Sequence, residues 1–439
     1  MKRFLLLAMI GFVAFGCSKD RLTDPLDIEL DDLLGRLSPT GSADYYILPE
    51  SDDFGSIIAG VNNPITAEKV ELGKLFFYET ALAGDAMHES SRYTYSCATC
   101  HLPEAGFMPG RKQGIADGGM GMGNDRGMNE DYDESELDTQ AGRALSLLNV
   151  SYVTNTTWTG KFGANHTNAD TENIWDVFED THINYTGLDG IEAQLIEGQV
   201  LHRMKVDEYV LDELGYRALY DAAFPDYPVE ERYGAETTAF ALAAYIRTLL
   251  SNKAPFQEWL KGERGALTDM QKEGALLFYG KAGCVRCHKG PSMSANEYHA
   301  IGVKDMYDSH GFNTSVDDLR NFGRGGFTGK EEDLYKFKVP TIYNMKDSPF
   351  YFHGSSKHTL WGVVEYFNDA IPENERVDRN ISPLFHPLNL TTIEIQQLVA
   401  FLADGLRDPD LDRYVPDAVL SGNCFPNNDP ISREIMGCE

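Results

Sequence analysis

The sequence predicts a mainly α-helical chain built from two copies of one small helical unit. A Cys-x-x-Cys-His motif occurs twice, as "SCATCH" at 96–101 and as "GCVRCHK" at 283–289. Strand-like alternation of apolar and polar residues is scarce. Residues lie in register before each motif, and such self-similarity indicates an internal duplication. The matching pairs are Gly73 and Gly274, Phe77 and Phe278, and Tyr78 and Tyr279.

The first element along the chain is an export signal. Two basic residues precede an apolar run from Phe4 to Phe15, which is too short to span a membrane as a mature helix. A small residue and then Cys17 follow, as at a bacterial lipoprotein cleavage site. We expect a periplasmic protein that is lipid-anchored to a membrane at Cys17; a plain signal peptide with a chance cysteine is the alternative.

The remaining elements follow from the repeated pattern. A helical pattern at 71–80 opens the first unit and another at 272–288 opens the second, with Thr268 or Asp269 as its cap. Each unit ends on an amphipathic helix, at 239–250 and at 395–406. The predicted segments are a signal peptide at 1–16, a spacer after the anchor at 17–62, a first domain at 63–262, a second domain at 263–410, and a tail at 411–439.

Charge and cysteine content narrow the class of protein. The formal net charge of −30 argues against nucleic acid as a partner, because phosphate contacts need Lys and Arg. The negative charge permits a basic protein partner, and an acidic surface that only keeps the protein in solution is the alternative. Outside Cys17 and the two motifs only Cys424 and Cys438 remain, and in an oxidising compartment we expect them to form a disulfide in the tail.

In an exported chain the Cys-x-x-Cys-His motif is typical of c-type haem attachment. The two thiols bond one porphyrin and the adjacent imidazole binds its iron. A zinc site would need the two thiol pairs close together, and a redox dithiol would not need the histidine twice. The residues expected to hold one haem for each motif are Cys97, Cys100 and His101, and Cys284, Cys287 and His288.

Longer segments carry a family resemblance. They include "LGKLFFYETALAG" before "SCATCHLPEAGF", "GRALSLLNVSY", "WTG" at 158–160, "AAYIRTLLSNKAPFQEWLKGERGALTDMQKEGALLFYGKAGCVRCHKGP", "KVPTIYNM", "YFHG" and "TLWGVVEYFN". Over roughly residues 63–410 the chain resembles the bacterial di-haem cytochrome c peroxidase family, which includes the maturation enzyme of methylamine dehydrogenase. The resemblance implies two cytochrome c-like helical domains, each with one covalently bound haem c, and a calcium ion at their junction.

The resemblance also implies an activity. Members of the family reduce hydrogen peroxide to water at the N-terminal haem, with electrons that a small cytochrome c or copper protein gives to the C-terminal haem. His101 corresponds to the proximal ligand of the peroxide haem and His288 to that of the electron-transfer haem. Trp158 corresponds to a tryptophan between the haems, with a space-filling core residue as the alternative, and Asn149 to a calcium ligand. A homodimer is among the assemblies that the resemblance allows.

The chain departs from the family on the peroxide side. Many members cap the N-terminal iron with a histidine soon after the motif, but residues 102–165 contain none. We expect an open site, with a methionine of the loop as the alternative cap. The family's distal glutamate aligns with Arg203, which His202 precedes. His202 can move a proton and Arg203 can stabilise negative charge, so we predict them as catalytic residues; Glu197 as the acid, or His202 as an iron ligand, are the alternatives.

The sixth ligand of the C-terminal haem is a second departure. Counting from His353, as in the family, leads to Phe367, which cannot bind iron. Tyr366 is one residue away, but adjacent helix positions point about 100° apart, so its use would need a shifted turn. Met345 is a further candidate.

Three functions are consistent with these residues. The first is a di-haem peroxidase. The second is a maturation-type oxidase that modifies side chains of a partner protein, which the missing capping histidine favours. The third is a di-haem electron-transfer protein without catalysis.

Overall fold

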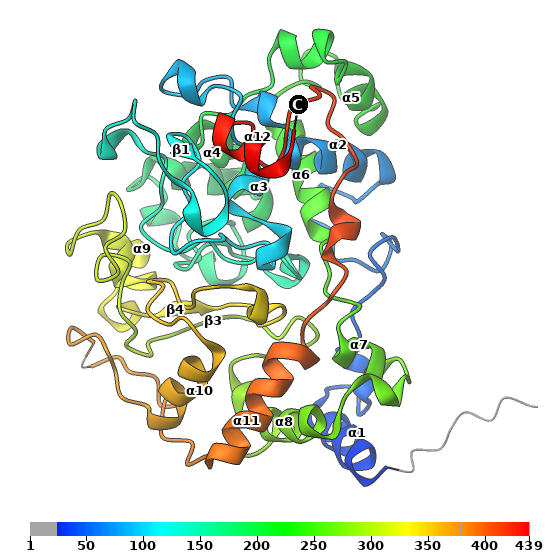
Figure 1. The fold of residues 1–439 in the computed structure, drawn as a ribbon, viewed down its shortest axis with the longest axis vertical. Coiled ribbons are helices and arrows are strands. Elements are labelled where there is room, and N and C mark those ends of the chain that lie inside the picture. The colour runs from blue at the N-terminus through cyan, green and yellow to red at the C-terminus, as the bar shows by residue number, and fades with distance from the viewer. Residues whose placement is uncertain (1–23, 378, 439) are drawn as a thin grey trace, which may run out of the picture.

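The computed structural model describes residues 24–377 and 379–438, which form two helical lobes (Figure 1). The predicted signal peptide and Cys17 lie outside the described residues. Helices contain 43% of the residues and strands contain 6%, so the predicted mainly α fold is confirmed. None of the described helices is long and apolar enough to cross a membrane.

The first lobe surrounds the first motif. Its elements are α2 (Ala67–Tyr78), α3 (Cys97–Cys100), β1 (Gly119–Met120), β2 (Gly127–Met128), α4 (Gly190–Leu201), α5 (Arg217–Ala223), α6 (Ala235–Arg247) and α12 (Pro430–Met436). β1 and β2 pair antiparallel, with Gly119 opposite Met128.

The second lobe surrounds the second motif, which begins in a 3-10 turn at Cys284–Arg286. Its elements are α1 (Pro25–Leu37), α7 (Pro255–Leu260), α8 (Asp269–Tyr279), β3 (Ala295–His299), α9 (Arg324–Thr328), β4 (Phe337–Val339), α10 (Leu360–Asp369) and α11 (Thr392–Ala400). β3 and β4 pair antiparallel and lie between the two lobes in Figure 1. The predicted cap is confirmed: Thr268 accepts from Gln271 N at the start of α8.

Each lobe is organised by one helix crossing, and the glycines in register explain it. A Cβ on Gly73 of α2 would lie 2.0 Å from the main-chain oxygen of Ala241 in α6. A Cβ on Gly274 of α8 would lie 2.0 Å from the main-chain oxygen of Gln397 in α11. The missing side chain therefore lets the two helices of each pair touch through their main chains.

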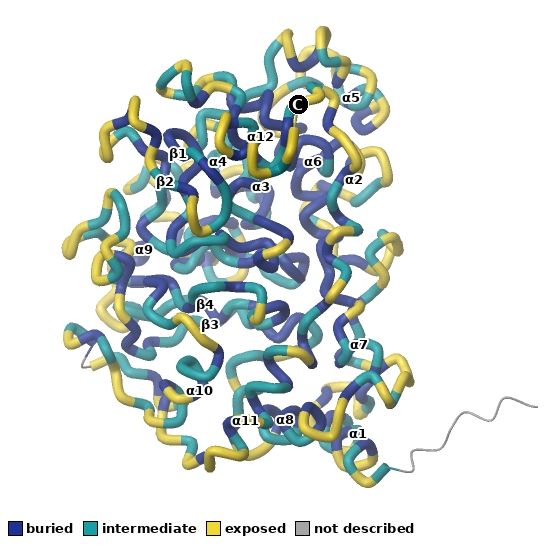
Figure 2. The backbone as a smooth tube through the Cα atoms, in the orientation of Figure 1, coloured by how far each residue is buried: buried dark blue, intermediate teal, exposed yellow. Residues whose placement is uncertain are grey.

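Two separate cores fill the lobes, and buried segments gather inside them in Figure 2. The first core is built around Phe76 and Tyr245, and the second around Phe278 and Phe401. Trp259 of α7 belongs to the second core although it precedes the predicted boundary at 263, because α7 packs against aromatic residues of that lobe.

The spacer expected for residues 17–62 is wrong for the part that the structure describes. Leu30 and Leu34 lie on one face of α1 and are fully buried in the second core. Asp27 of the same helix is buried against the Lys272 ammonium at 2.7 Å. The acidic outer face of this helix hides its apolar stripe in the sequence, which is why it reads as a linker.

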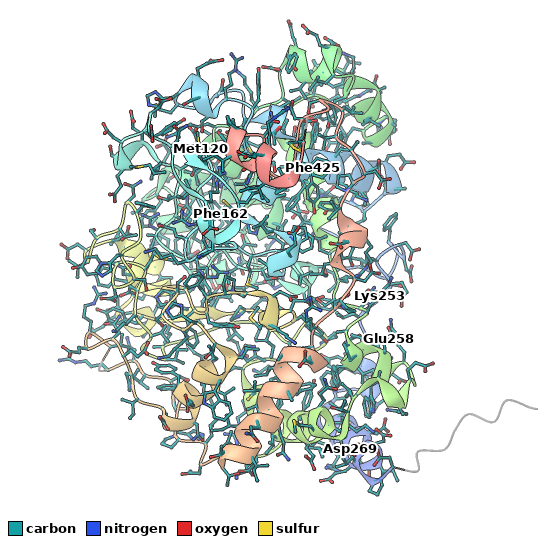
Figure 3. The ribbon with its side chains drawn as sticks, viewed as in Figure 1. Met120, Phe162, Lys253, Glu258, Asp269 and Phe425 are labelled. Carbon is teal, nitrogen blue, oxygen red and sulfur yellow. A yellow bond between two sulfur atoms is a disulfide. The ribbon has the colours of Figure 1, made fainter. Side chains whose placement is uncertain are left out.

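The tail returns from the second lobe to the first. In Figure 3, Phe425 lies in the same lobe as Met120 and Phe162, whereas Glu258 and Asp269 lie in the other. The predicted disulfide between Cys424 and Cys438 is present.

Candidate active site

The first motif forms one helical turn, α3, with its imidazole at the C-terminal end. Ser96 N donates to Thr99 Oγ1 at 2.9 Å and closes the start of the turn. Burial raises the pKa of Cys97 and Cys100 to about 12, yet both residues keep part of their surface accessible.

His101 is held as a neutral imidazole with one free nitrogen. Its Nδ1 lies 3.0 Å from the main-chain oxygen of Phe107 and donates its proton to it, which leaves the lone pair on Nε2. The pKa of His101 is lowered to about 4, mainly by burial, which outweighs the opposing effect of the hydrogen bond to Phe107; the charges of His202 and Arg143 make smaller contributions. This is the form of histidine that binds iron.

The second motif repeats this arrangement. His288 Nδ1 lies 3.0 Å from the oxygen of Met293 and 3.2 Å from that of Pro340, so its Nε2 is also free. Burial lowers the pKa of His288 and raises that of Cys284 to about 12.

Both motifs fit a covalently attached haem, since each offers two thiols and a neutral imidazole with a free Nε2. Beside the first motif, Gly114 lies so close to Cys100 that a Cβ there would be 2.7 Å from the sulfur. In residues 24–377 and 379–438, no three or more His, Cys, Asp or Glu side chains gather as a metal-ion site, the arrangement that a structural zinc site requires.

His202 and Arg203 end α4 in a Schellman turn. Met204 N donates to Gln199 O at 2.8 Å and Arg203 N donates to Val200 O at 3.1 Å. Arg203 occupies the left-handed position of this turn, with φ of 53°, where glycine is usual because a side chain costs about 1 kcal/mol. Backbone strain of this kind gathers at functional sites.

Each of the two cations has a buried carboxylate as its partner. His202 Nδ1 donates to Asp138 Oδ2 at 2.7 Å, and Arg203 Nη1 donates to Asp117 Oδ2 at 2.5 Å. Asp138 is 4% exposed and Asp117 is fully buried, whereas the His202 side chain is 38% exposed. Burial lowers the pKa of His202, but the charge of Asp138 and the hydrogen bond to it outweigh this effect and raise it.

Two observations place this pair beside the first motif. Tyr95, which directly precedes Ser96, donates from its hydroxyl to the main-chain oxygen of His202 at 2.9 Å. The charge of His202 is also among the causes that lower the pKa of His101. The structure therefore brings the predicted catalytic pair and the first predicted haem site together.

The alternative acid, Glu197, lies in a different environment. Five helix positions separate it from His202, which corresponds to a rotation of about 140°. Burial raises the pKa of Glu197, and the charges of Asp180 and Glu179 raise it further.

A pocket of about 370 Å³ lies beside the Schellman turn that ends α4. Gln199, Arg203 and Met204 are among the residues that line it. Met204 also packs in the small cluster that contains Tyr95 and Cys100. Met204 thus connects the lining of the pocket to the surroundings of the first motif.

The three methionines of the loop after the first motif, Met120, Met122 and Met128, take part in the local structure of that loop or lie at its surface. Met120 pairs with Gly127 in the β1–β2 ribbon. Met122 Sδ accepts a hydrogen bond from Asn427 Nδ2 at 3.0 Å. Met128 is 44% exposed.

Tyr366 of α10 is buried in the second lobe. Its hydroxyl donates to the main-chain oxygen of Ile301 at 2.5 Å, and its ring packs against Phe352 and Phe385. Burial raises the pKa of Tyr366. Its role as an iron ligand stays a prediction.

Trp158 lies at the junction between the lobes. Its Nε1 donates to Arg143 O at 2.6 Å, and its own main-chain oxygen accepts from Lys338 N at 2.9 Å. The indole meets the His353 ring edge-on at 6.0 Å, and that ring stacks on Phe337 at 3.6 Å. This is a position that an electron relay between lobes would need; the relay itself stays a prediction.

Asn149 and Asn344 occupy equivalent places in the two lobes. Both have left-handed backbones, with φ of 58° and 56°. Asn149 Oδ1 accepts from Ser251 N at 3.0 Å, and Asn344 Oδ1 accepts from Asp408 N at 3.2 Å. The duplication therefore gives Asn149 a structural role, and calcium binding by it stays a prediction.

Sequence reasoning missed four residues of this region: Asp117, Asp138, Arg111 and Arg143. The two aspartates stand in an acidic, glycine-rich loop that reads as solvated surface. The sequence shows many carboxylates close to clusters of glycine in this loop, but this pattern does not indicate which residues the carboxylates contact.

The chain has recognisable relatives among known proteins. Residues 67–265 match the family model described as di-haem cytochrome c peroxidase. The chain is 26% identical over 382 residues to cytochrome-c peroxidase IdrP2 of Denitromonas iodatirespirans, covering 82% of this chain and 85% of the relative. It is 28% identical over 342 residues to methylamine utilization protein MauG of Methylorubrum extorquens, covering 77% of this chain and 78% of the relative.

A solved structure shares the fold. It is a MauG-like protein associated with microbial copper homeostasis, with a TM-score of 0.59 and 23% sequence identity, covering 83% of this chain and 95% of that one. The predicted pair of cytochrome c-like helical domains is confirmed by this likeness and by the family match.

Proposed function

Because the chain belongs to the di-haem cytochrome c peroxidase family, an oxidoreductase family that carries two haems, we propose that it reduces hydrogen peroxide to water with electrons from a small redox protein. The observation that carries this proposal is the cation pair at the end of α4, His202 and Arg203. Each cation is fixed by a buried carboxylate, and the pair lies beside a motif with a free imidazole nitrogen.

The reaction consumes hydrogen peroxide, two electrons and two protons and yields two molecules of water. Haem c, when bound at the two motifs, supplies the redox-active iron for this reduction. His202 Nε2 takes a proton from one peroxide oxygen and returns it to the other, which leaves as water. Asp138 fixes the tautomer through Nδ1–H and stabilises the imidazolium, and Arg203 stabilises the negative charge that develops on oxygen.

Electrons reach this site, in our proposal, from the second lobe through Trp158. The donor is a small cytochrome c or copper protein. A net charge of −30 favours a donor with a basic docking face, because opposite charges steer association. Tyr366 as sixth ligand of the second haem is part of the proposal, and it requires the hydroxyl to leave its main-chain partner.

The oxidised, haem-loaded protein provides the test. A high-spin ferric signal in optical and EPR spectra, together with peroxide turnover that His202→Ala abolishes, is expected. Two low-spin signals and no turnover would favour the electron-transfer protein, and full turnover in His202→Ala would remove His202 from the mechanism.

A maturation-type oxidase is the second candidate. The observation that favours it is the absence of histidine between 102 and 165, which leaves no histidine cap for the first site in that stretch. The similarity to MauG adds support. This candidate predicts poor turnover with reduced cytochrome and peroxide-dependent modification of side chains in one partner protein.

Location and assembly complete the proposal. We propose a periplasmic protein with lipid on Cys17, which Cys17→Ala should release from the membrane fraction. A homodimer is tested by sedimentation. A calcium ion at Asn149 is tested by metal analysis of the purified protein before and after chelation, since Asn149 Oδ1 already accepts one hydrogen bond but has a second lone pair.

A further inference from the structure

Arg143 is a buried cation that pairs with no carboxylate of residues 24–377 and 379–438. Its residue is 2% exposed, and its Nε has no hydrogen-bond partner. Nη2 donates to the main-chain oxygen of Pro109 at 2.5 Å and to Ser348 Oγ at 3.0 Å, and Nη1 donates to the main-chain oxygen of Arg111. All of these acceptors are neutral. An isolated charge in such surroundings is unfavourable, and burial accordingly lowers the pKa of Arg143 to about 9.

Arg111, whose main-chain oxygen accepts from Arg143, also has buried guanidinium nitrogens without a hydrogen-bond partner among the described residues. These are its Nε and Nη1, and its guanidinium lies 5.7 Å from the centre of the Phe312 ring. Part of the residue stays accessible. Burial lowers the pKa of Arg111, and the charge of Arg126 lowers it further. Arg126 itself has a carboxylate partner, Asp429, at 3.3 Å.

Within the described part of the chain, no carboxylate pairs with Arg111 or Arg143, which is unusual for this protein. It holds 68 acidic and 38 basic residues, so carboxylates are abundant. The equally buried Arg126 and Arg247 both pair with one. Two arginines joined by a hydrogen bond from the Arg143 guanidinium to the main-chain oxygen of Arg111, each with unused donors, therefore form a site for an anion that the described protein residues do not supply.

The position of the two arginines identifies that anion. Arg143 donates to the main-chain oxygens of Pro109 and Arg111. These two residues lie in the segment between Phe107, whose oxygen accepts from His101 Nδ1, and Gly114, which lies against Cys100 Sγ, so both arginines border the first motif. The group that this motif attaches carries two propionate carboxylates. A planar guanidinium binds a carboxylate through two parallel hydrogen bonds.

We propose that Arg111 and Arg143 form a carboxylate site that binds the propionates of the haem attached at Cys97 and Cys100. Because Arg143 also contacts Ser348 of the second lobe, this site ties the first haem to the junction between lobes. The inference rests on the haem attachment that underlies the proposed function and not on the peroxide chemistry.

The test uses the haem-loaded full chain in the absence of peroxide. Resonance Raman bands of the propionate groups, together with the reduction potential of the N-terminal haem, are compared in Arg111→Met, Arg143→Lys and the parent protein. We expect shifted propionate bands in both variants. We expect a lower potential in Arg111→Met, because the loss of a cation disfavours reduction.

Arg324→Met is the matched control. This arginine is 5% exposed and has no carboxylate partner among the described residues, but it donates to the main-chain oxygens of Thr159, Gly160 and Thr167 and none of its buried atoms lacks a partner. The N-terminal haem should be unaffected in it.

Three outcomes decide the matter. Shifted bands in Arg111→Met and Arg143→Lys but not in Arg324→Met support the propionate site, even in a protein that fails to turn over peroxide. Unchanged bands and potential in Arg111→Met, whose partly exposed side chain makes it the better tolerated change, overturn it. Unchanged bands combined with a saturable spectral response of the parent protein to added acetate also overturn it, because the site then takes a free carboxylate.

Discussion

Asp138→Asn is the sharpest perturbation of the proposed catalytic pair. The substitution keeps the shape of the side chain and an acceptor for His202 Nδ1, but it removes the charge. Hydrogen bonds to charged groups contribute about 1.5–3 kcal/mol and neutral ones about 1 kcal/mol. Since the His202 side chain is 38% exposed, solvent screening reduces the difference to about 1 kcal/mol.

The sign of the pH effect follows from the raised pKa of His202. Burial alone would lower this pKa, and the charge of Asp138 and the hydrogen bond to it raise it above the ordinary value of about 6.5. The stabilisation is therefore fully present below about pH 6.5 and is lost as the pH rises through the raised value. In Asp138→Asn it should be missing at low pH and make little difference at high pH.

Two assays measure this effect. The melting temperature of the haem-loaded protein should fall by about 1 °C at pH 5.5, because about 1 kcal/mol is divided by the unfolding entropy of the whole chain, and by less at pH 8.5. The neutral form of His202 is the base, so the acid limb of the kcat/KM profile should move to lower pH, while the maximum falls by about fivefold. Asp125→Asn, an exposed carboxylate of the same loop, is the control. An acid limb that stays in place, with equal melting losses at both pH values, would refute the reasoning.

Three further changes test other parts of the molecule. Arg203→Gln should lower kcat/KM for peroxide by about 10²-fold with haem content unchanged, whereas Arg217→Gln on the exposed surface should not, and equal rates for both would exclude a catalytic arginine. Gly73→Ala should destabilise the first lobe by at least about 1–3 kcal/mol, because its Cβ would lie 2.0 Å from a main-chain oxygen; Gly127→Ala, with open space around it, should melt like the parent protein. Trp158→Phe removes the 2.6 Å hydrogen bond to the first lobe and should slow electron transfer between haems in rapid-mixing experiments, while an unchanged rate would place the path elsewhere.

The sequence predicted what is local or repeated. The two motifs, the in-register pair Gly73 and Gly274 and the cap at Thr268 all depend on residues that lie within one helical turn or recur in register. Such features can be predicted from the sequence without knowledge of the fold.

The residues that the sequence left out depend on contacts over long distances along the chain. Asp138 lies 64 residues from His202, and Asp117 lies 86 residues from Arg203. Nothing in the acidic loop distinguishes these two carboxylates from their solvated neighbours until the chain folds back on α4. For the same reason the helix at 25–37 read as a spacer, since its apolar stripe has meaning only against the second core.

The difference between the lobes bears on how one duplicated unit could perform two tasks. His101 and His288 are held alike, each with Nδ1 on a main-chain oxygen and Nε2 free. What surrounds them is not alike. Beside the first lie His202 and Arg203, each held by a buried carboxylate and each assigned a catalytic role in the proposed function. In the second lobe Tyr366 is buried among aromatic rings with its hydroxyl on a carbonyl. A donor that delivers one electron at a time to a two-electron reaction needs one reactive centre and one storage centre, and a duplicated scaffold can provide both when only the side chains outside the repeat differ.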